Sequence, residues 1–380
     1  MHTLRRCAAT TAAIVTATAG LVAASGILAT SAGAWTGSFI GNLNTVTPIA
    51  STMPDNGDVN PYGVAVVPRS HGHLQAGNVL VSNFNDAANI QGTGTTIVQV
   101  TPGGQASLFA QIDPQLPGCP GGVGLTTALV ALRNGWVIVG SLPTQQVNGN
   151  TVISGSGCLI VLDSQGNVRE TFKGHGINGP WDMTALDLGG ITELFVTNVL
   201  NGTVAAGGNT VDKGTVLRLL ITSGPFGSPR LLNVTRIGSG FTERTDPAAL
   251  VIGPTGVGLG PDGTLYVADT PNNRIAAIPG AAVRLSEDGT GQTVTTGGAL
   301  NGPLGLAITP NGNILTVNSG DGKLVEITPS GFQIAVRQLD STVSPGSPPG
   351  AGALFGLAVK PHHRAVYFVD DATNTFELLH

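Results

Sequence analysis

Short apolar runs separated by Gly, Pro, Asn and Asp recur along the chain at nearly regular intervals. The clearest examples read GVGLGPDGTLYVAD from Gly256, GLAITPNGNILTVN from Gly305 and GLAVKPHHRAVYFVD from Gly356. Each contains an apolar strand that begins at Gly, a turn, and a second apolar strand that ends in Asp or Asn. A polar turn and a third strand follow. A repeat of roughly fifty residues that contains only strands predicts a β-propeller.

The rest of the chain fits the same repeat of strands and turns. No amphipathic helical pattern of any length follows residue 34. The sixth blade has only three strands, and residues 44–51 supply the missing one. Pairing the two ends of the chain closes the ring and leaves no exposed sheet edge. The pattern therefore predicts a single all-β domain over residues 35–380, a six-bladed β-propeller of four-stranded antiparallel blades closed by an N-terminal strand. The expected blades are residues 60–112, 122–173, 179–237, 253–298, 302–339 and 353–380.

Residues 1–34 have the pattern of an export signal. Arg5 and Arg6 precede an apolar stretch over residues 12–29, and Ala32-Gly33-Ala34 matches a small-residue cleavage site. The alternative is a membrane anchor, which the Thr, Ser and Gly content and the cleavage site disfavour. We therefore expect a signal peptide and a mature protein that is secreted or otherwise extracytoplasmic.

The charge balance narrows the choice of partner. Cleavage before Trp35 removes two Arg and no acidic residue, which leaves 15 Lys and Arg against 22 Asp and Glu, a net charge of −7. This acidic excess argues against nucleic acid or an anionic membrane as the partner. No segment after the signal is long and apolar enough to insert into a bilayer. A closed ring without free sheet edges predicts a monomer.

Two cysteines, Cys119 and Cys158, remain after Cys7 leaves with the signal peptide. An even pair in an oxidising compartment predicts one disulfide. It would close a loop of about forty residues and stabilise the fold by about 3–4 kcal/mol. Two cysteines without nearby His ligands make a poor zinc site.

Blade four carries a more specific motif. Tyr266-Val267-Ala268-Asp269, followed by Arg274-Ile275, resembles the NHL-repeat family, whose blades commonly carry apolar residues, Val-Ala-Asp, a turn and Arg-Ile. Blades five and six match this motif loosely, and blades one to three match it in outline. The chain is similar in this way to NHL-type six-bladed propellers and to the gluconolactonase-like and virginiamycin B lyase-like propellers. The resemblance implies the fold, and it leaves binding proteins, lactonases and lyases open as functions.

Three long connections mark one face of the predicted propeller. Adjacent strands of a blade are antiparallel, so the start of the innermost strand lies beside the end of the second strand. The turns between second and third strands open on this face, and in the first three blades they are long, at residues 84–94, 142–156 and 199–213. Long surface loops cost little to close and often carry function. We therefore expect the working surface on this face, with the disulfide holding two of its loops.

Asp182 stands at the innermost position of blade three, where other blades have Gly. A carboxylate that faces the channel among Asn side chains is a candidate site for Ca²⁺ or another divalent cation. The resemblance also implies a metal site, since gluconolactonase-like propellers hold a metal in this region with carboxylate and Asn ligands. This chain departs from them at Asn60, where they have Glu. The alternative is that Asp182 caps its own turn or binds channel water, and that the strand-end amides form turns. The candidate ligands beside Asp182 are Asn60, Asn178, Asn198, Asn301 and Asn318.

Two neighbours of Asp182 are further candidates. His175 is a candidate acid or base at the channel mouth, the alternative being a solvated loop histidine. Trp181 is a candidate pocket residue, the alternative being a core tryptophan. The sequence contains no G-x-S-x-G elbow, H-E-x-x-H motif, phosphate loop or complete EF-hand loop.

Two functions from different classes follow from these features. The first, which we favour, is a binding or scaffold module for a small molecule or a protein that uses the three long loops. The second is a metal-assisted lactonase- or lyase-type enzyme centred on Asp182, His175 and the surrounding asparagines. The sequence leaves open whether the protein is an enzyme, and it identifies neither the ligand nor the metal.

Overall fold

The computed structural model describes residues 37–224, 227–246 and 249–380. The predicted signal peptide, residues 1–34, lies outside the described residues. In the described ranges, η1 (Thr270–Asn272) is the one helical element, and no helix is long and apolar enough to cross a membrane. The predicted all-β class is therefore confirmed.

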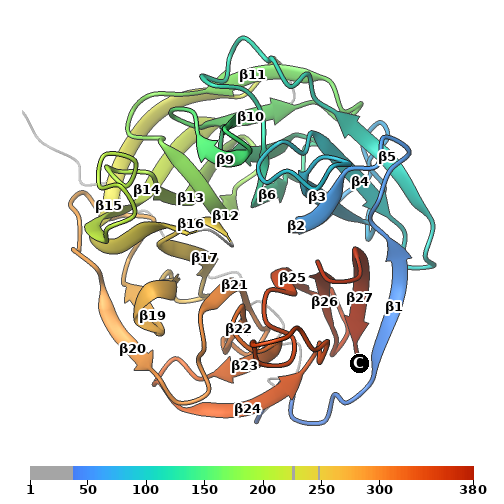
Figure 1. Ribbon diagram of the computed structural model, residues 1–380, viewed down its shortest axis with the longest axis vertical. Coiled ribbons are helices and arrows are strands. Elements are labelled where there is room, and N and C mark those ends of the chain that lie inside the picture. Colours follow the sequence, from blue (N-terminus) through green and yellow to red (C-terminus); the bar gives the residue numbers. More distant parts are fainter. Residues whose placement is uncertain (1–36, 225–226, 247–248) are drawn as a thin grey trace, which may run out of the picture. The chain divides into compact units, whose positions relative to one another are not determined.

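Six antiparallel sheets surround a central axis as the blades of a propeller (Figure 1). Blade one contains β2 (Val59–Val66), β3 (Val79–Asn85), β4 (Thr96–Val100) and β5 (Ala106–Gln111). Blade two contains β6 (Leu125–Ala131), β7 (Val137–Ser141), β10 (Cys158–Leu162) and β11 (Val168–Phe172). Blade three contains β12 (Gly179–Asp187), β13 (Ile191–Val199), β14 (Val211–Thr222), β15 (Arg230–Asp246) and β16 (Leu250–Ile252).

The second half of the ring repeats the pattern, with shorter connections between the second and third strands. Blade four contains β17 (Pro254–Leu259), β18 (Leu265–Asp269), β19 (Arg274–Ile278) and β20 (Gln292–Thr296). Blade five contains β21 (Pro303–Ile308), β22 (Ile314–Asn318), β23 (Lys323–Ile327) and β24 (Gln333–Gln338). Blade six contains β25 (Leu354–Val359), β26 (Val366–Asp370), β27 (Thr375–Leu379) and β1 (Val46–Ser51).

Apolar side chains fill the space between neighbouring blades. In one such layer, Ile138 and Leu159 of blade two pack with Leu194 and Leu217 of blade three, and all four are buried. Side chains of a strand alternate between its two faces, and each blade contacts a neighbour on both faces. This explains why the middle strands are nearly continuous runs of Val, Ile and Leu.

Glycines allow the innermost strands to approach one another around the axis. A Cβ atom added to Gly256 would overlap the carbonyl group of Leu304 in the next blade, and one added to Gly305 would overlap that of Phe355. The backbone of each inner strand therefore rests directly on its neighbour. Blade three places Asp182 at the corresponding point, just after a bulge in β12.

The two ends of the chain meet in blade six. Strand β1 pairs with β27 in antiparallel register, with Val46 opposite Leu379 and Ser51 opposite Thr375. This pairing confirms the predicted closure by an N-terminal strand.

A buried carboxylate fastens the segment before β1 to blade five. Glu326 on β23 is fully buried and accepts backbone hydrogen bonds from Phe39 (2.6 Å) and Ile40 (2.9 Å). The side chains of Ser38 and Asn313 also donate to it. The chain is therefore anchored to blade five before it enters blade six.

Two parts of the structure differ from the expected blades. The connection 142–156 contains a hairpin, β8 (Thr144–Val147) and β9 (Asn150–Ile153), whose turn residues Asn148 and Gly149 both have positive φ. Asn-Gly between two strands is the usual signal for such a turn, so this hairpin was readable from the sequence. Blade three also has a fifth strand, β16, because β15 extends well beyond its predicted end at residue 237.

Candidate functional site

The three long connections meet around one cavity of about 660 Å³, which we name the long-loop cavity. It lies on the face where the second and third strands of blades one to three are joined. Strand β16 and the end of β15 close its remaining side. Its lining includes Asn89, Gln91, Val152, Val204, Thr245 and Leu250.

Hydrogen bonds hold the loops of this cavity in place. Asp86 accepts backbone hydrogen bonds from Ala88 and Ile90, which folds the loop 84–94 on itself. The hydroxyl group of Thr144 donates to the carbonyl oxygen of Gly92 at 2.9 Å and so joins the first loop to the hairpin of the second. The first two loops therefore form a connected surface.

The third loop, residues 199–213, is held in place by Glu243 on β15. Its carboxylate is buried and accepts a 2.8 Å hydrogen bond from the backbone N–H of Asn201. Burial raises the pKa of Glu243 to about 7, and the hydrogen bonds from Asn201 oppose that rise.

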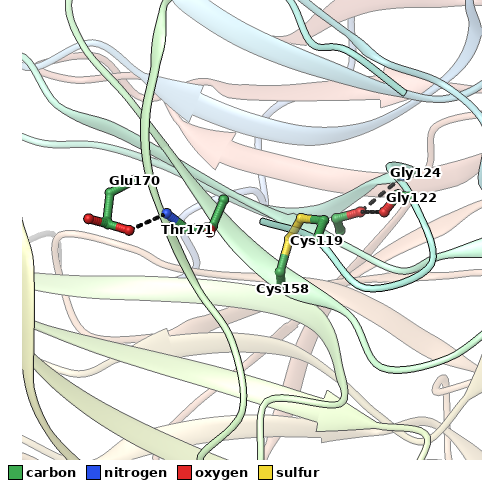
Figure 2. Close-up of a disulfide and its surroundings, with 7 residues drawn as sticks. Cys119, Gly122, Gly124, Cys158, Glu170 and Thr171 are labelled. Atoms are coloured by element: carbon green, nitrogen blue, oxygen red, sulfur yellow. Dashed lines mark hydrogen bonds between the residues drawn. A yellow bond between two sulfur atoms is a disulfide. The ribbon is translucent and has the colours of Figure 1, made fainter. Parts of the chain in front are cut away.

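The predicted disulfide between Cys119 and Cys158 is confirmed (Figure 2). Its Cα atoms lie 5.4 Å apart, and both residues are buried. Figure 2 shows the bridge between β10 and the segment that leads into β6, beside Gly122 and Gly124. Cys158 directly follows the long connection 142–156, so the bridge holds the end of that connection.

A second cavity of about 710 Å³, which we name the channel-mouth cavity, lies on the same face and is lined by residues of blades one, three, four, five and six. It borders the long-loop cavity at Asp246, which lines both. Residues from the starts of the inner strands and from the turns after the second strands line it, including Asn60, Tyr62, Asn301, Leu304, Phe355 and Asp371.

An aromatic layer forms the floor of the channel-mouth cavity. Tyr62 stacks between Phe84 and Phe355, with ring centroids 4.4 and 3.9 Å away, and Trp181 lies 6.5 Å from Tyr62. Trp181 is buried, and its indole N–H donates to the carbonyl oxygen of Val251 at 3.2 Å. The structure therefore places Trp181 in the packed core of the channel.

The charged groups of the channel-mouth cavity are Arg244, Asp246 and Asp371. Arg244 and Asp246 form an ion pair at 2.9 Å. Burial raises the pKa of Asp371 to about 7. Burial and the nearby Asp371 carboxylate raise the pKa of Tyr62 well above its usual value, while the Asn60 side chain opposes the rise. The phenol of Tyr62 is therefore neutral near pH 7.

Asp182 lies on the other side of the aromatic layer. It lines a third cavity of about 540 Å³, the far-side cavity, which opens toward the face opposite the long loops and also contains Arg133 and Asp187. Its Oδ1 accepts a hydrogen bond from the backbone N–H of Met183 (2.8 Å), and its Oδ2 accepts one from that of Val257 (3.1 Å). Burial raises the pKa of Asp182 to about 7, and the two backbone bonds oppose the rise.

The asparagines predicted as metal ligands fall into separate places. Asn198 accepts hydrogen bonds from the backbone of Asn178 (2.8 Å) and donates to a backbone carbonyl, as a turn-forming residue does. The side chain of Asn318 donates to the carbonyl oxygen of Ala299. Asn60 and Asn301 line the channel-mouth cavity. The structure thus brings together Asn178 with Asn198 and Asn60 with Asn301, and it places Asp182 with neither pair.

His175 lies away from Asp182. It is exposed, with a φ of 52°, in a small cavity near the outer strands β11 and β15, together with Lys173 and Arg230. Over the described part of the chain, no group of three or more His, Cys, Asp and Glu side chains could hold a metal ion. A cation at Asp182 would compete with two backbone hydrogen bonds, so these residues fit a metal poorly. The metal and catalytic roles of the candidate residues stay predictions.

Sequence reasoning missed Asp371 and Arg244. Asp371 follows Asp370, which ends the second strand of blade six and accepts a 3.2 Å hydrogen bond from the backbone N–H of Thr373. Asp370 forms the turn, which leaves Asp371 available to the cavity. Two consecutive acidic residues at a strand end could therefore have pointed to Asp371 from the sequence. Arg244 lies on the unforeseen extension of β15, and no local pattern marks it.

Comparison with known proteins agrees with this fold. The NHL repeat model matches residues 252–278, which include the first three strands of blade four. The chain carries an NHL repeat. No curated protein matches the sequence. The recognised resemblance to NHL-type propellers is thereby confirmed.

Solved structures similar to this NHL-repeat propeller include several enzymes. A gluconolactonase from Xanthomonas campestris has a TM-score of 0.53 at 13% identity, with 89% of this chain and 95% of that chain covered. A luciferin-regenerating enzyme has a TM-score of 0.52 at 11% identity, with 88% and 95% covered. Virginiamycin B lyase from Staphylococcus aureus has a TM-score of 0.49 at 15% identity, with 88% and 85% covered. At these identities the similarity shows the fold alone.

Proposed function

We propose that this protein is an exported binding propeller that holds a small molecule or a protein segment in the long-loop cavity. One observation carries the proposal: the connections between the second and third strands of blades one to three, far apart in sequence, meet around a single cavity. Loops positioned by a rigid scaffold are a common way to build a binding surface. The disulfide supports export, because such bonds persist in oxidising compartments.

The lining of the cavity indicates the kind of ligand. Amide and hydroxyl groups of Asn89, Gln91 and Thr245 alternate with the aliphatic side chains of Val204 and Leu250. Asp246, which is already paired with Arg244, is the one charged side chain that the described residues contribute to this lining. Pockets of this composition bind molecules that combine an apolar body with a few hydrogen-bonding groups. A neutral ligand therefore fits best.

Filling the cavity tests this proposal. Val204 is 59% exposed and lines the cavity, whereas Leu188 is 67% exposed on the opposite face of the same blade. Neutral amide- and hydroxyl-bearing fragments are screened by saturation-transfer NMR against the wild-type protein, Val204→Trp and Leu188→Trp. Fragments that bind the wild type and Leu188→Trp but not Val204→Trp support the proposal. Fragments that bind all three proteins equally contradict it.

The second candidate function is a metal-assisted lactonase or lyase at the channel mouth. Its support is that the buried Oδ1 atoms of Asn60 and Asn318 have no hydrogen-bond partner among the described residues. Amide oxygens are ligands that hard cations accept. Hydrolysis of glucono-δ-lactone with and without added Ca²⁺ tests this function. We rank it second because Asp182, the candidate carboxylate ligand, does not line the channel-mouth cavity, and both of its oxygens already accept backbone hydrogen bonds.

A further inference from the structure

We propose that the channel-mouth cavity binds a small organic ammonium ion, with the Asp371 carboxylate as its counter-ion and Tyr62 and Phe355 beside its apolar part. This site is separate from the long-loop cavity on which the proposed function rests.

Asp371 presents a carboxylate without a partner inside the described structure. Its backbone is fixed, since its N–H donates to Ala353 at 2.8 Å and its carbonyl oxygen accepts from Asn374. Its side chain makes no hydrogen bond or ion pair with any described residue. The neighbouring Asp370 differs, because it accepts a hydrogen bond from its own turn. A half-buried carboxylate without a partner is costly, and a cationic ligand would relieve that cost.

The charged side chains that line the cavity carry a net negative charge. Arg244 is neutralised by Asp246 at 2.9 Å, and the raised pKa of Tyr62 keeps its phenol neutral. The remaining polar side chains of the lining are amides and hydroxyls such as Asn301. One unbalanced carboxylate therefore remains, which suits a ligand with a single positive charge.

The mixed lining of the cavity suits an organic cation better than a metal ion. Tyr62 and Phe355 stack at 3.9 Å, and Ile252, Leu304 and Pro271 line the same cavity. Calcium takes six to eight oxygen ligands, and among the described residues no group of three or more His, Cys, Asp and Glu side chains gathers here to supply them. An ammonium group on an apolar body needs only one carboxylate, a few oxygens and aromatic rings nearby. The amide oxygen of Asn60, which has no partner among described residues, is available to such a ligand.

Calorimetric titration at pH 8 with benzylamine and with the neutral analogue benzyl alcohol tests the proposal. The proteins compared are wild type, Asp371→Asn and Asp212→Asn. Asp212 is exposed on β14 and lines neither cavity, so its variant controls for the change in net charge. We expect the wild type and Asp212→Asn to bind benzylamine at least about tenfold more tightly than benzyl alcohol, a difference of about 1.4 kcal/mol. Asp371→Asn should lose that preference.

A second measurement needs no variant. Benzylamine affinity of the wild-type protein should fall about tenfold between pH 8 and pH 6 as Asp371 takes up a proton, while benzyl alcohol affinity stays constant. Equal binding of the two probes, or no binding of either, overturns the proposal. Ca²⁺ binding that depends on Asp371 without any benzylamine binding assigns the cavity to a metal instead. Val204→Trp should leave benzylamine binding unchanged, which separates this inference from the proposed function.

Discussion

The carboxylate Oδ2 of Asp182 accepts a 3.1 Å hydrogen bond from the backbone N–H of Val257, and this bond joins blade three to blade four. Its Oδ1 accepts a second bond from Met183, so both oxygens are engaged by backbone groups. The hydroxyl group of Thr197 makes a parallel link when it donates to the carbonyl oxygen of Thr255 at 2.6 Å. Asp182 therefore acts in the described structure as a tie between two inner strands.

Removing this carboxylate should destabilise the fold. Asp182→Ala leaves the N–H groups of Met183 and Val257 buried without an acceptor, and we expect the free energy of unfolding to fall by about 2–4 kcal/mol. Urea denaturation measures the change, with Asp212→Ala as an exposed control that should lose less than about 1 kcal/mol. An Asp182→Ala protein as stable as the wild type, with loss of bound Ca²⁺, would instead identify Asp182 as a metal ligand.

Stability should depend on pH in a direction set by buried carboxyl groups. Burial raises the pKa of Asp182, Glu243, Asp370 and Asp371 to about 7. Because these values exceed the unfolded value of about 4, the native state binds more protons, and stability is lost as pH rises through about 7. We expect the melting temperature to fall between pH 5 and pH 8, and Asp182→Asn to reduce that fall. Differential scanning calorimetry across this window checks the sign, and a rising melting temperature refutes it.

The N-terminal anchor should control closure of the ring. Glu326→Ala removes the acceptor for the backbone N–H groups of Phe39 and Ile40, and we expect a loss of about 3 kcal/mol or more in stability. Limited proteolysis should then cleave the chain before β1 first. Glu170→Ala, at an exposed position of β11, is the control and should leave proteolysis unchanged. Equal protease resistance of both variants would show that the anchor does not limit opening.

The blades were predictable because their signals are local. A glycine-led apolar strand, a turn and a second strand define each repeat, and NHL-type residues such as Tyr266 and Arg274 mark blade four. The closure followed from a missing strand, and the disulfide followed from the two cysteines left after export. These features depend on neighbours in sequence or on simple counting.

The site was harder to predict because it depends on contacts between distant residues. The aromatic layer that separates Asp182 from the long-loop face joins Tyr62, Trp181 and Phe355, which belong to three different blades. The bulge between Pro180 and Asp182 also sets where the carboxylate points, and no local pattern reveals that direction. The pairing of Asp182 with backbone N–H groups of the next blade could not be deduced from composition or spacing.

Ligand binding on the long-loop face can be observed in crystals of the mature protein soaked with a mixture of neutral amide and polyol fragments. We expect electron density for fragments in the long-loop cavity, in contact with Asn89, Val152 or Val204. Fragments that gather instead in the far-side cavity around Asp182, with the long-loop cavity empty in every crystal, would contradict it.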